Sequence, residues 1–199
     1  MTIQLLSVNV GIVGSLLASD EEEGYIRIPS AFDKRAVAGA VKVTHMGLVG
    51  DEQADHDAHG DINKAVYAYP VEHYAFWQAQ RKMHLRRDET LPYGGVAENL
   101  TISGLLEDQI WIGDRLQIGE VLLAVTEPRE PCFKFNIRMG FSKAAKLMLQ
   151  SGYSGFYLKV LQEGYVTAGD AITVIAGPRK ETVAAFNERR RTKHQPDLF

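Results

Sequence analysis

Apolar and polar residues alternate over many short stretches of the chain, and this two-residue period is typical of half-buried β-strands. The pattern predicts strands at residues 3–10, 40–46, 65–69, 98–102, 109–112, 115–118, 121–126, 164–166 and 171–175. Gly113-Asp114 and Gly119-Glu120 mark tight turns between three of these segments. Several short strands joined by such turns are typical of a β-barrel or a β-sandwich.

Other segments predict helices, at residues 71–84, 141–150, 156–162 and 182–191. Pro70 suits the start of the first helix, because the first turn does not need the N–H that proline lacks. Ser142 could cap the second helix and Gly152 could end it. The polar, glycine-containing stretch 11–38 predicts no regular element. The fold class that follows is mainly β with helices, an α+β architecture.

Composition and charge narrow the classes of function. The 199 residues carry a formal net charge of −3, and the only dense run of cations, at 189–193, is interpreted as a solvated helix end rather than a nucleic-acid patch. No segment approaches the roughly 20 apolar residues of a membrane span, and the N-terminus lacks a secretory pattern. The single cysteine cannot form an internal disulfide. We therefore expect a soluble, cytoplasmic protein that binds neither nucleic acid nor membrane.

Cys132 is the candidate reactive residue with the most charged and polar side chains close to it in the sequence. If the stretch after Pro131 is extended, alternate side chains share a face. One face would then carry Phe133, Phe135 and Ile137, and the other Cys132, Lys134, Asn136 and Arg138. Nearby cations favour the thiolate, which is both a nucleophile and a metal ligand, and the same cations could hold a phosphate. The alternative is a buried, inert thiol.

Residues 50–64 contain five acids and two histidines without apolar periodicity. A loop of this length is often functional. At the rim of a pocket, His59 or Lys64 could bind an anion or move a proton. Zinc bound by His56 and His59 is a second interpretation, and an acidic loop exposed to solvent is a third.

Two further segments contain candidate ligand-binding residues. After Gly94-Gly95, Glu98 could accept hydrogen bonds from a ligand, and Asn99 could donate and accept them. Ser154 could belong to an anion-binding nest at the start of a helix. A plain turn is the alternative for both segments.

These segments, taken in order, resemble the MOSC family (molybdenum cofactor sulfurase C-terminal domain). The similarity is carried by Gly50-Asp51-Glu52-Gln53-Ala54-Asp55-His56, His59-Gly60, Lys64-Ala65-Val66, Glu98-Asn99-Leu100, Ile112-Gly113-Asp114, Pro128-Arg129, Pro131-Cys132-Phe133-Lys134, Gly152-Tyr153-Ser154-Gly155, Glu163-Gly164 and Gly169-Asp170. It spans roughly residues 3–178, and Cys132 falls where the family has its invariant cysteine. The nearest branch is that of the stand-alone bacterial proteins linked to resistance to 6-N-hydroxylaminopurine.

The resemblance implies a β-barrel domain with peripheral helices over residues 1–178, which binds a pterin-based molybdenum cofactor, and a helical tail at 179–199. Cys132 would be the metal ligand and the catalytic thiol. The other cofactor-binding candidates are Lys134, Arg129, His59, Lys64, Asn99, Glu98, Asn136 and Ser154. The implied reaction is reduction of N-hydroxylated bases or related small compounds, with electrons from a separate donor protein. The resemblance leaves open pyridoxal phosphate as a bound group and a homodimer.

Two positions depart from the family pattern, because Asp61 and Ala97 stand where the family often has glycine. Either side chain could narrow the pocket, and Asp61 would repel a cofactor phosphate. Two alternatives to a reductase remain. One is a non-redox carrier or sulfur-transfer module with Cys132 as ligand or persulfide site. The other is a hydrolase that pairs Cys132 with His59 or His56.

Overall fold

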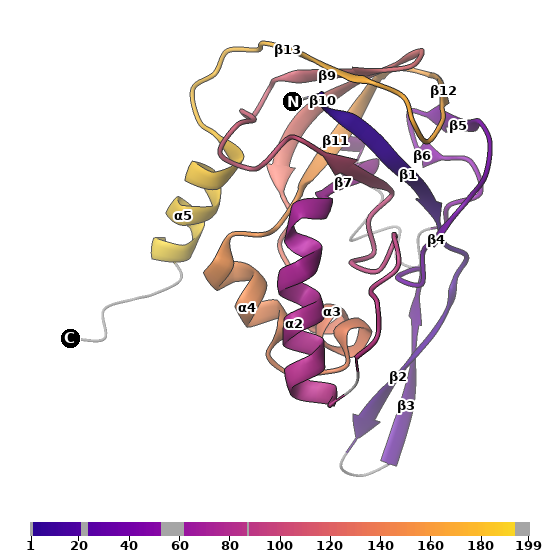
Figure 1. The fold of residues 1–199 in the computed structure, drawn as a ribbon, viewed down its shortest axis with the longest axis vertical. Coiled ribbons are helices and arrows are strands. Elements are labelled where there is room, and N and C mark those ends of the chain that lie inside the picture. The colour runs from indigo at the N-terminus through magenta and orange to yellow at the C-terminus, as the bar shows by residue number, and fades with distance from the viewer. Residues whose placement is uncertain (1, 21–23, 53–61, 87, 194–199) are drawn as a thin grey trace.

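The computed structural model describes residues 2–20, 24–52, 62–86 and 88–193 (Figure 1). Its strands are β1 Gln4–Val10, β2 Gly14–Asp20, β3 Gly24–Ser30, β4 Arg35–Ala36, β5 Val41–Thr44, β6 Gly47–Leu48, β7 Val66–Pro70, β8 Leu100–Ser103, β9 Arg115–Ile118, β10 Val121–Pro128, β11 Phe156–Gln162, β12 Gly164–Val166 and β13 Ile172–Ile175. Its helices are η1 Ile62–Lys64, η2 Val71–His73, α2 Tyr74–Leu85, α3 Phe133–Met139, α4 Ala144–Ser151 and α5 Val183–Lys193. The α+β expectation is confirmed.

The main sheet has eight strands in the order β13-β9-β10-β11-β7-β8-β1-β4. Its neighbours are antiparallel except for the parallel pair β7 and β8. A bridge between Gln4 and Ala171 brings β1 beside the residues that lead into β13. Three backbone hydrogen bonds add to it, two between Leu5 and residues 169–170 and one from Ile172 to Ile3. The described part of the chain forms no continuous ladder at this junction, so the sheet bends back on itself without becoming the closed barrel that we expected.

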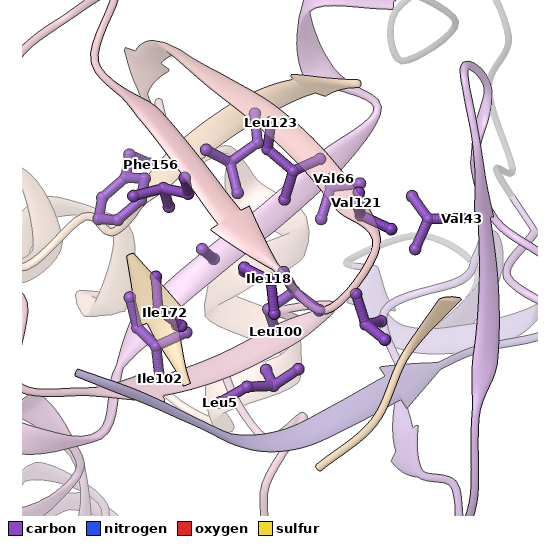
Figure 2. Close-up of a cluster of buried hydrophobic side chains, with 14 of the residues drawn as sticks. Leu5, Val43, Val66, Leu100, Ile102, Ile118, Val121, Leu123, Phe156 and Ile172 are labelled. Atoms are coloured by element: carbon purple, nitrogen blue, oxygen red, sulfur yellow. The ribbon is translucent and has the colours of Figure 1, made fainter. Parts of the chain in front are cut away.

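The core lies inside this bent sheet and is built from the side chains that alternate inward along its strands. Figure 2 shows residues from strands far apart in the sequence meeting there, among them Leu5, Leu100, Ile118, Leu123 and Phe156. Each of these five side chains is essentially fully buried. Removal of this apolar surface from water is the main force that holds the sheet in this shape.

A second apolar cluster joins helices α2, α3 and α4 to β7. Trp77 of α2 and Phe135 of α3 meet edge to face, with ring centroids 5.3 Å apart. The indole N–H of Trp77 donates to the hydroxyl of Tyr69 on β7. These contacts fix α3, and with it the segment around Cys132, against the sheet.

Two predicted segments have the opposite structure. The helix expected at 156–162 is the strand β11, in which Phe156, Leu158 and Val160 point inward. The stretch after Pro131, for which we considered an extended backbone, is the helix α3. Because a helix repeats every 3.6 residues, Phe133 is 58% exposed whereas Phe135 is buried, and the two do not share a face.

The sequence pattern also missed the hairpin of β2 and β3, which pair over their full length from Gly14 with Ser30 to Asp20 with Gly24. The hairpin extends away from the main sheet in Figure 1. Leu17 on β2 is exposed, so this strand lacks the buried face that produces a clear alternation. The strand expected at 109–112 forms no ladder, only a single bridge between Trp111 and Thr182.

Helices α4 and α5 correspond to the helices predicted at 141–150 and 182–191, with small differences at their ends. Helix α4 begins at Ala144 and no side chain caps it, so Ser142 is not its cap. Gly152 ends it in the left-handed conformation, with φ of +72°, as predicted. Helix α5 starts at Val183, which is buried in the main core. None of the helices in the described ranges is both long and apolar enough to cross a bilayer.

Candidate functional site

A cavity of about 160 Å3 lies where β3 and β10 end and where β7, β8, β11 and α3 begin. Its lining includes five of the predicted site residues, namely Lys64, Asn99, Arg129, Cys132 and Lys134. Three aromatic side chains form the apolar part of the wall, Phe32, Tyr67 and Tyr157. The structure thus gathers into one place residues that are up to 70 positions apart in the sequence, as Lys64 and Lys134 are.

Arg129 follows β10 directly and is only 4% exposed. One guanidinium nitrogen donates to the carbonyl oxygen of Val96 at 2.6 Å. The guanidinium carbon lies 4.8, 5.0 and 5.1 Å from the ring centres of Tyr67, Phe135 and Phe32, so aromatic faces stabilise much of its charge. Within the described residues no carboxylate pairs with Arg129, and a guanidinium carries five N–H donors. The site therefore presents a buried cation that can accept an anionic ligand.

Cys132 is a free, half-buried thiol at the residue that precedes helix α3. Its side chain lines the same cavity as those of Arg129 and Tyr157. Lys134, two residues further on, donates to the carbonyl oxygen of Pro29 at 3.3 Å and so joins α3 to the end of β3. The thiol and two cations share the cavity, although α3 is helical and not extended.

The helical form of α3 removes Asn136 from the site. Its side-chain oxygen accepts a hydrogen bond from the backbone N–H of Ala145 at 2.8 Å, which links α3 to α4. The side chain does not line the cavity. The expectation that Asn136 shares a face with Cys132 is therefore wrong, because it depended on an extended backbone.

The sequence missed a buried ion pair in the cavity wall. The Lys34 ammonium contacts both carboxylate oxygens of Asp51. Asp51 also accepts hydrogen bonds from the backbone N–H of Gly11 and from the side-chain amide of Asn99, both at 2.8 Å. Asn99 is held in turn by Tyr67, whose N–H donates to its side-chain oxygen at 3.1 Å. Lys34 stands alone in a stretch without any pattern, so no sequence signal marked it.

Glu98 lies behind the cavity wall rather than in it. Its carboxylate is 0% exposed and accepts hydrogen bonds from four donors, the hydroxyls of Tyr74 and Thr101 and the backbone N–H groups of Gly94 and Val96. It therefore holds the loop whose Val96 carbonyl contacts Arg129.

Ala97 does line the cavity, as the departure from the family pattern suggested. Its φ is +65°, which lies in the left-handed region that glycine adopts most easily. A glycine, which the family pattern led us to expect at this position, would adopt this backbone conformation without a Cβ.

Ser154 lies outside the cavity. Its hydroxyl donates to the carbonyl oxygen of Gly155 and accepts from the side-chain amide of Asn187. Phe156 starts a strand, so the expected anion nest at a helix start is wrong. His56, His59 and Asp61 lie outside the described residues, and the zinc and hydrolase interpretations depend on those histidines.

Burial changes the proton affinity of several cavity groups. Removal from water lowers the pKa of Lys34, although Asp51 attracts the ammonium and acts in the opposite direction. Burial raises the pKa of the Tyr67 and Tyr157 phenols, and Arg129 opposes that shift. Because burial penalises the charged form of each group, the two phenols stay protonated while Lys34 becomes a better proton donor.

The residues of this cavity fit an anionic cofactor that also takes a sulfur ligand. Arg129 is a buried cation with N–H donors directed at no described carboxylate. Lys34, Lys64 and Lys134 also line the cavity, together with the carboxylates of Asp51, Glu52 and Glu130, so Arg129 is the cation best placed for an anion. Cys132 supplies a soft sulfur ligand of the kind that molybdenum accepts.

Comparison with known proteins gives consistent matches. A family model described as the MOSC domain matches residues 55–173. Protein YflK of Bacillus subtilis (strain 168) is 35% identical, over 93% of this chain and 79% of that protein. The crystal structure of YiiM from Geobacillus stearothermophilus is 29% identical with a TM-score of 0.74, and the match covers 98% of this chain and 86% of that chain. A protein of Gibberella moniliformis (strain M3125 / FGSC 7600) named "Reductase" is 34% identical over 76% of this chain, but over only 26% of its own length.

Proposed function

This chain belongs to the MOSC domain family, and from that premise we propose that it binds the pterin-based molybdenum cofactor and reduces N-hydroxylated bases or related compounds. The observation that carries the proposal is the pairing of a free thiol, Cys132, with a buried cation, Arg129, in one cavity. When bound, this cofactor supplies two-electron redox chemistry at its metal.

The cavity residues have distinct proposed roles. Cys132 ligates the metal through its thiolate. Arg129 binds an anionic group of the cofactor through its remaining N–H donors, and Lys64 and Lys134 add charge at the rim. Asn99 helps to hold the cavity wall in place for the cofactor, because its side-chain amide donates a hydrogen bond to Asp51.

The aromatic wall suits a flat substrate. Tyr67 and Tyr157 have ring centres 5.2 Å apart, and Phe32 lies against Arg129 on the cavity side. Faces of this kind stack on the ring of a purine. The match to the Gibberella protein named "Reductase" favours a reductase over a carrier. Electrons would come from a separate donor protein, and we place the reaction in the cytoplasm.

The first test measures molybdenum in protein expressed with a working cofactor pathway. Wild-type protein should carry molybdenum, and Cys132→Ala should lose at least about tenfold of it, because the thiolate is the protein's ligand to the metal. Phe133→Ala is a matched control, since Phe133 is the adjacent residue and is exposed. Equal metal in wild type and Cys132→Ala would remove Cys132 as the ligand.

The second test separates a reductase from a carrier. Metal-loaded protein is supplied with reduced methyl viologen, and the loss of 6-N-hydroxylaminopurine is followed by chromatography. We expect conversion to adenine that depends on Cys132. A fully loaded protein without turnover, together with a persulfide on Cys132 by mass spectrometry, would replace the reductase with a sulfur-transfer module.

A further inference from the structure

Lys34 occupies a cavity position that the surrounding chain is shaped to hold. Its side chain is 9% exposed and lines the cavity. Two glycines pack against Lys34, one against its carbonyl group and one against its side chain. A Cβ at Gly94, where φ is +80°, would lie 2.6 Å from the Lys34 carbonyl oxygen. A Cβ at Gly11 would lie 3.2 Å from Cγ of Lys34. A Cβ at Gly94 would collide with the Lys34 carbonyl, so glycine at this position allows the close approach of the Lys34 backbone.

The hydrogen bonds of the Lys34 ammonium leave a donor for a ligand. An ammonium carries three N–H donors. Among the described residues its acceptors are the two oxygens of Asp51. Asp51 is held by Gly11 and Asn99, so the ammonium is fixed at one end and has an N–H left for the cavity that it lines.

The other described donors of the cavity are less suited to release a proton. Arg129 stays protonated under all ordinary conditions. Lys64 is one-third exposed and lies 3.5 Å from Glu127, and Lys134 already donates to a backbone carbonyl. Burial raises the pKa of Tyr67, which makes its phenol a weaker acid.

Burial, rather than the net effect of the neighbouring charges, makes Lys34 a stronger acid than an exposed lysine. Burial lowers its pKa, and Arg129 acts in the same direction, whereas Asp51 and Glu98 act against it. A donor whose pKa lies nearer to the working pH is more effective in general acid catalysis.

We propose that Lys34 is the proton donor for cleavage of the N–O bond, and that Asp51 is its positioning residue. The inference rests on the proposed reductase function. In the balanced reaction, R–NH–OH takes up two electrons and two protons and becomes R–NH2 and water. A separate flavin- or iron–sulfur-containing donor protein would supply the electrons, and the cofactor, when bound, would supply the two-electron redox chemistry. Lys34 protonates the hydroxyl oxygen, the N–O bond breaks, that oxygen leaves as water, and the second proton reaches the nitrogen from solvent. The neutral Lys34 amine then regains its proton from water.

The test uses metal-loaded protein and reduced methyl viologen, with 6-N-hydroxylaminopurine as substrate. Lys34→Arg keeps the charge but cannot release the proton. We expect unchanged molybdenum content, a fall in kcat of at least about 100-fold, and a smaller change in KM. Lys42→Arg is the matched control, because Lys42 is exposed on β5 away from the cavity.

The pH profile gives a second readout. For the wild type, kcat should fall as pH rises through the pKa of Lys34, because the ammonium is the reactive form. Asp51→Asn should move this fall to lower pH, because the carboxylate that stabilises the ammonium is lost. A purely structural role for Asp51 would reduce kcat without moving the profile.

A third measurement needs no cofactor. In 13C-labelled cofactor-free protein, the Cε resonance of Lys34 should titrate at lower pH than that of exposed Lys42. Titration together with Lys42, or at higher pH, would overturn the proposal. So would a loaded Lys34→Arg variant with kcat within about threefold of the wild type, or one that loses its molybdenum. Loaded wild type without turnover would overturn the reductase function itself, and the Lys34 role with it.

Discussion

Replacement of Glu98 by glutamine tests whether one buried carboxylate holds the loop behind the cavity. The change keeps the shape of the side chain but replaces one oxygen by an NH2 group. In all four of its hydrogen bonds the Glu98 carboxylate is the acceptor. An amide nitrogen cannot accept any of them.

The cost follows from which oxygen is lost. One oxygen accepts from Tyr74, Gly94 and Thr101, and the other accepts only from Val96 at 3.0 Å. The cheaper orientation places the NH2 group against the Val96 N–H and leaves a buried donor without an acceptor, at about 1–3 kcal/mol. The other three bonds lose their charged acceptor and about half of their strength, or about 0.5–1 kcal/mol each. We expect Glu98→Gln to lower the free energy of unfolding by about 2.5–6 kcal/mol.

Urea denaturation followed by circular dichroism measures this change. With a slope of about 2–3 kcal/mol/M, the midpoint should fall by about 1–3 M. Glu188→Gln is the control. Glu188 is exposed and its only described ion pair is with Arg191, so its loss should cost less than about 1 kcal/mol. A Glu98→Gln midpoint as close to the wild type as that of the control would refute the role of Glu98 in holding the loop.

Three other predictions test the helix α3, the aromatic wall and the buried cation. Phe135→Ala should cost about 3–5 kcal/mol and Phe133→Ala less than about 1 kcal/mol in urea denaturation, whereas equal costs would support an extended segment. Because burial raises the pKa of Tyr67 in the folded state, its contribution to stability is present below about pH 10 and is lost as pH rises beyond it. In Tyr67→Phe the free energy of unfolding should therefore fall less steeply between pH 9 and about 11 than in the wild type. An equally steep fall would contradict the burial of the Tyr67 phenol as the cause of the wild-type decline. Arg129→Met should reduce molybdenum content at least about tenfold relative to a Lys42→Met control, and full loading of both would exclude Arg129 as the anion-binding residue.

Alternation in the sequence predicted the strands of the main sheet where one face is buried and the other is not. β9 and β10 follow this pattern closely, with Leu116, Ile118, Leu123 and Val125 inside. A shift of the strand pairing by one residue would turn every one of these side chains to the exposed face. The pairing register of the two strands is therefore strongly specified by the sequence.

Alternation failed where a short apolar run could suit a strand or a helix equally well. Residues 156–162 form a strand because β10 and β7 lie on either side and supply its hydrogen bonds. Residues 133–139 form a helix because Phe135 and Met139, four positions apart, both enter the cluster around Trp77. In each case partners distant in the sequence decided the local structure.

The candidate site was predicted in part. Cys132, Arg129 and Lys134 lie within six positions of one another, so their association was visible in the sequence. Lys34 was not visible, because its partner Asp51 is 17 residues away. The contact between Asp51 and Asn99 spans 48 residues.

The sequence by itself determined that the chain is an α+β domain with one thiol beside several cations, because periodicity and near neighbours are local properties. The tertiary structure decided which polar groups face the cavity and which hold the scaffold. Lys34 faces the cavity, whereas Glu98, Asn136 and Ser154 are engaged by donors and acceptors elsewhere. The physical reason is that a buried polar group must find hydrogen-bond partners, and in this fold many of those partners lie on distant strands and loops.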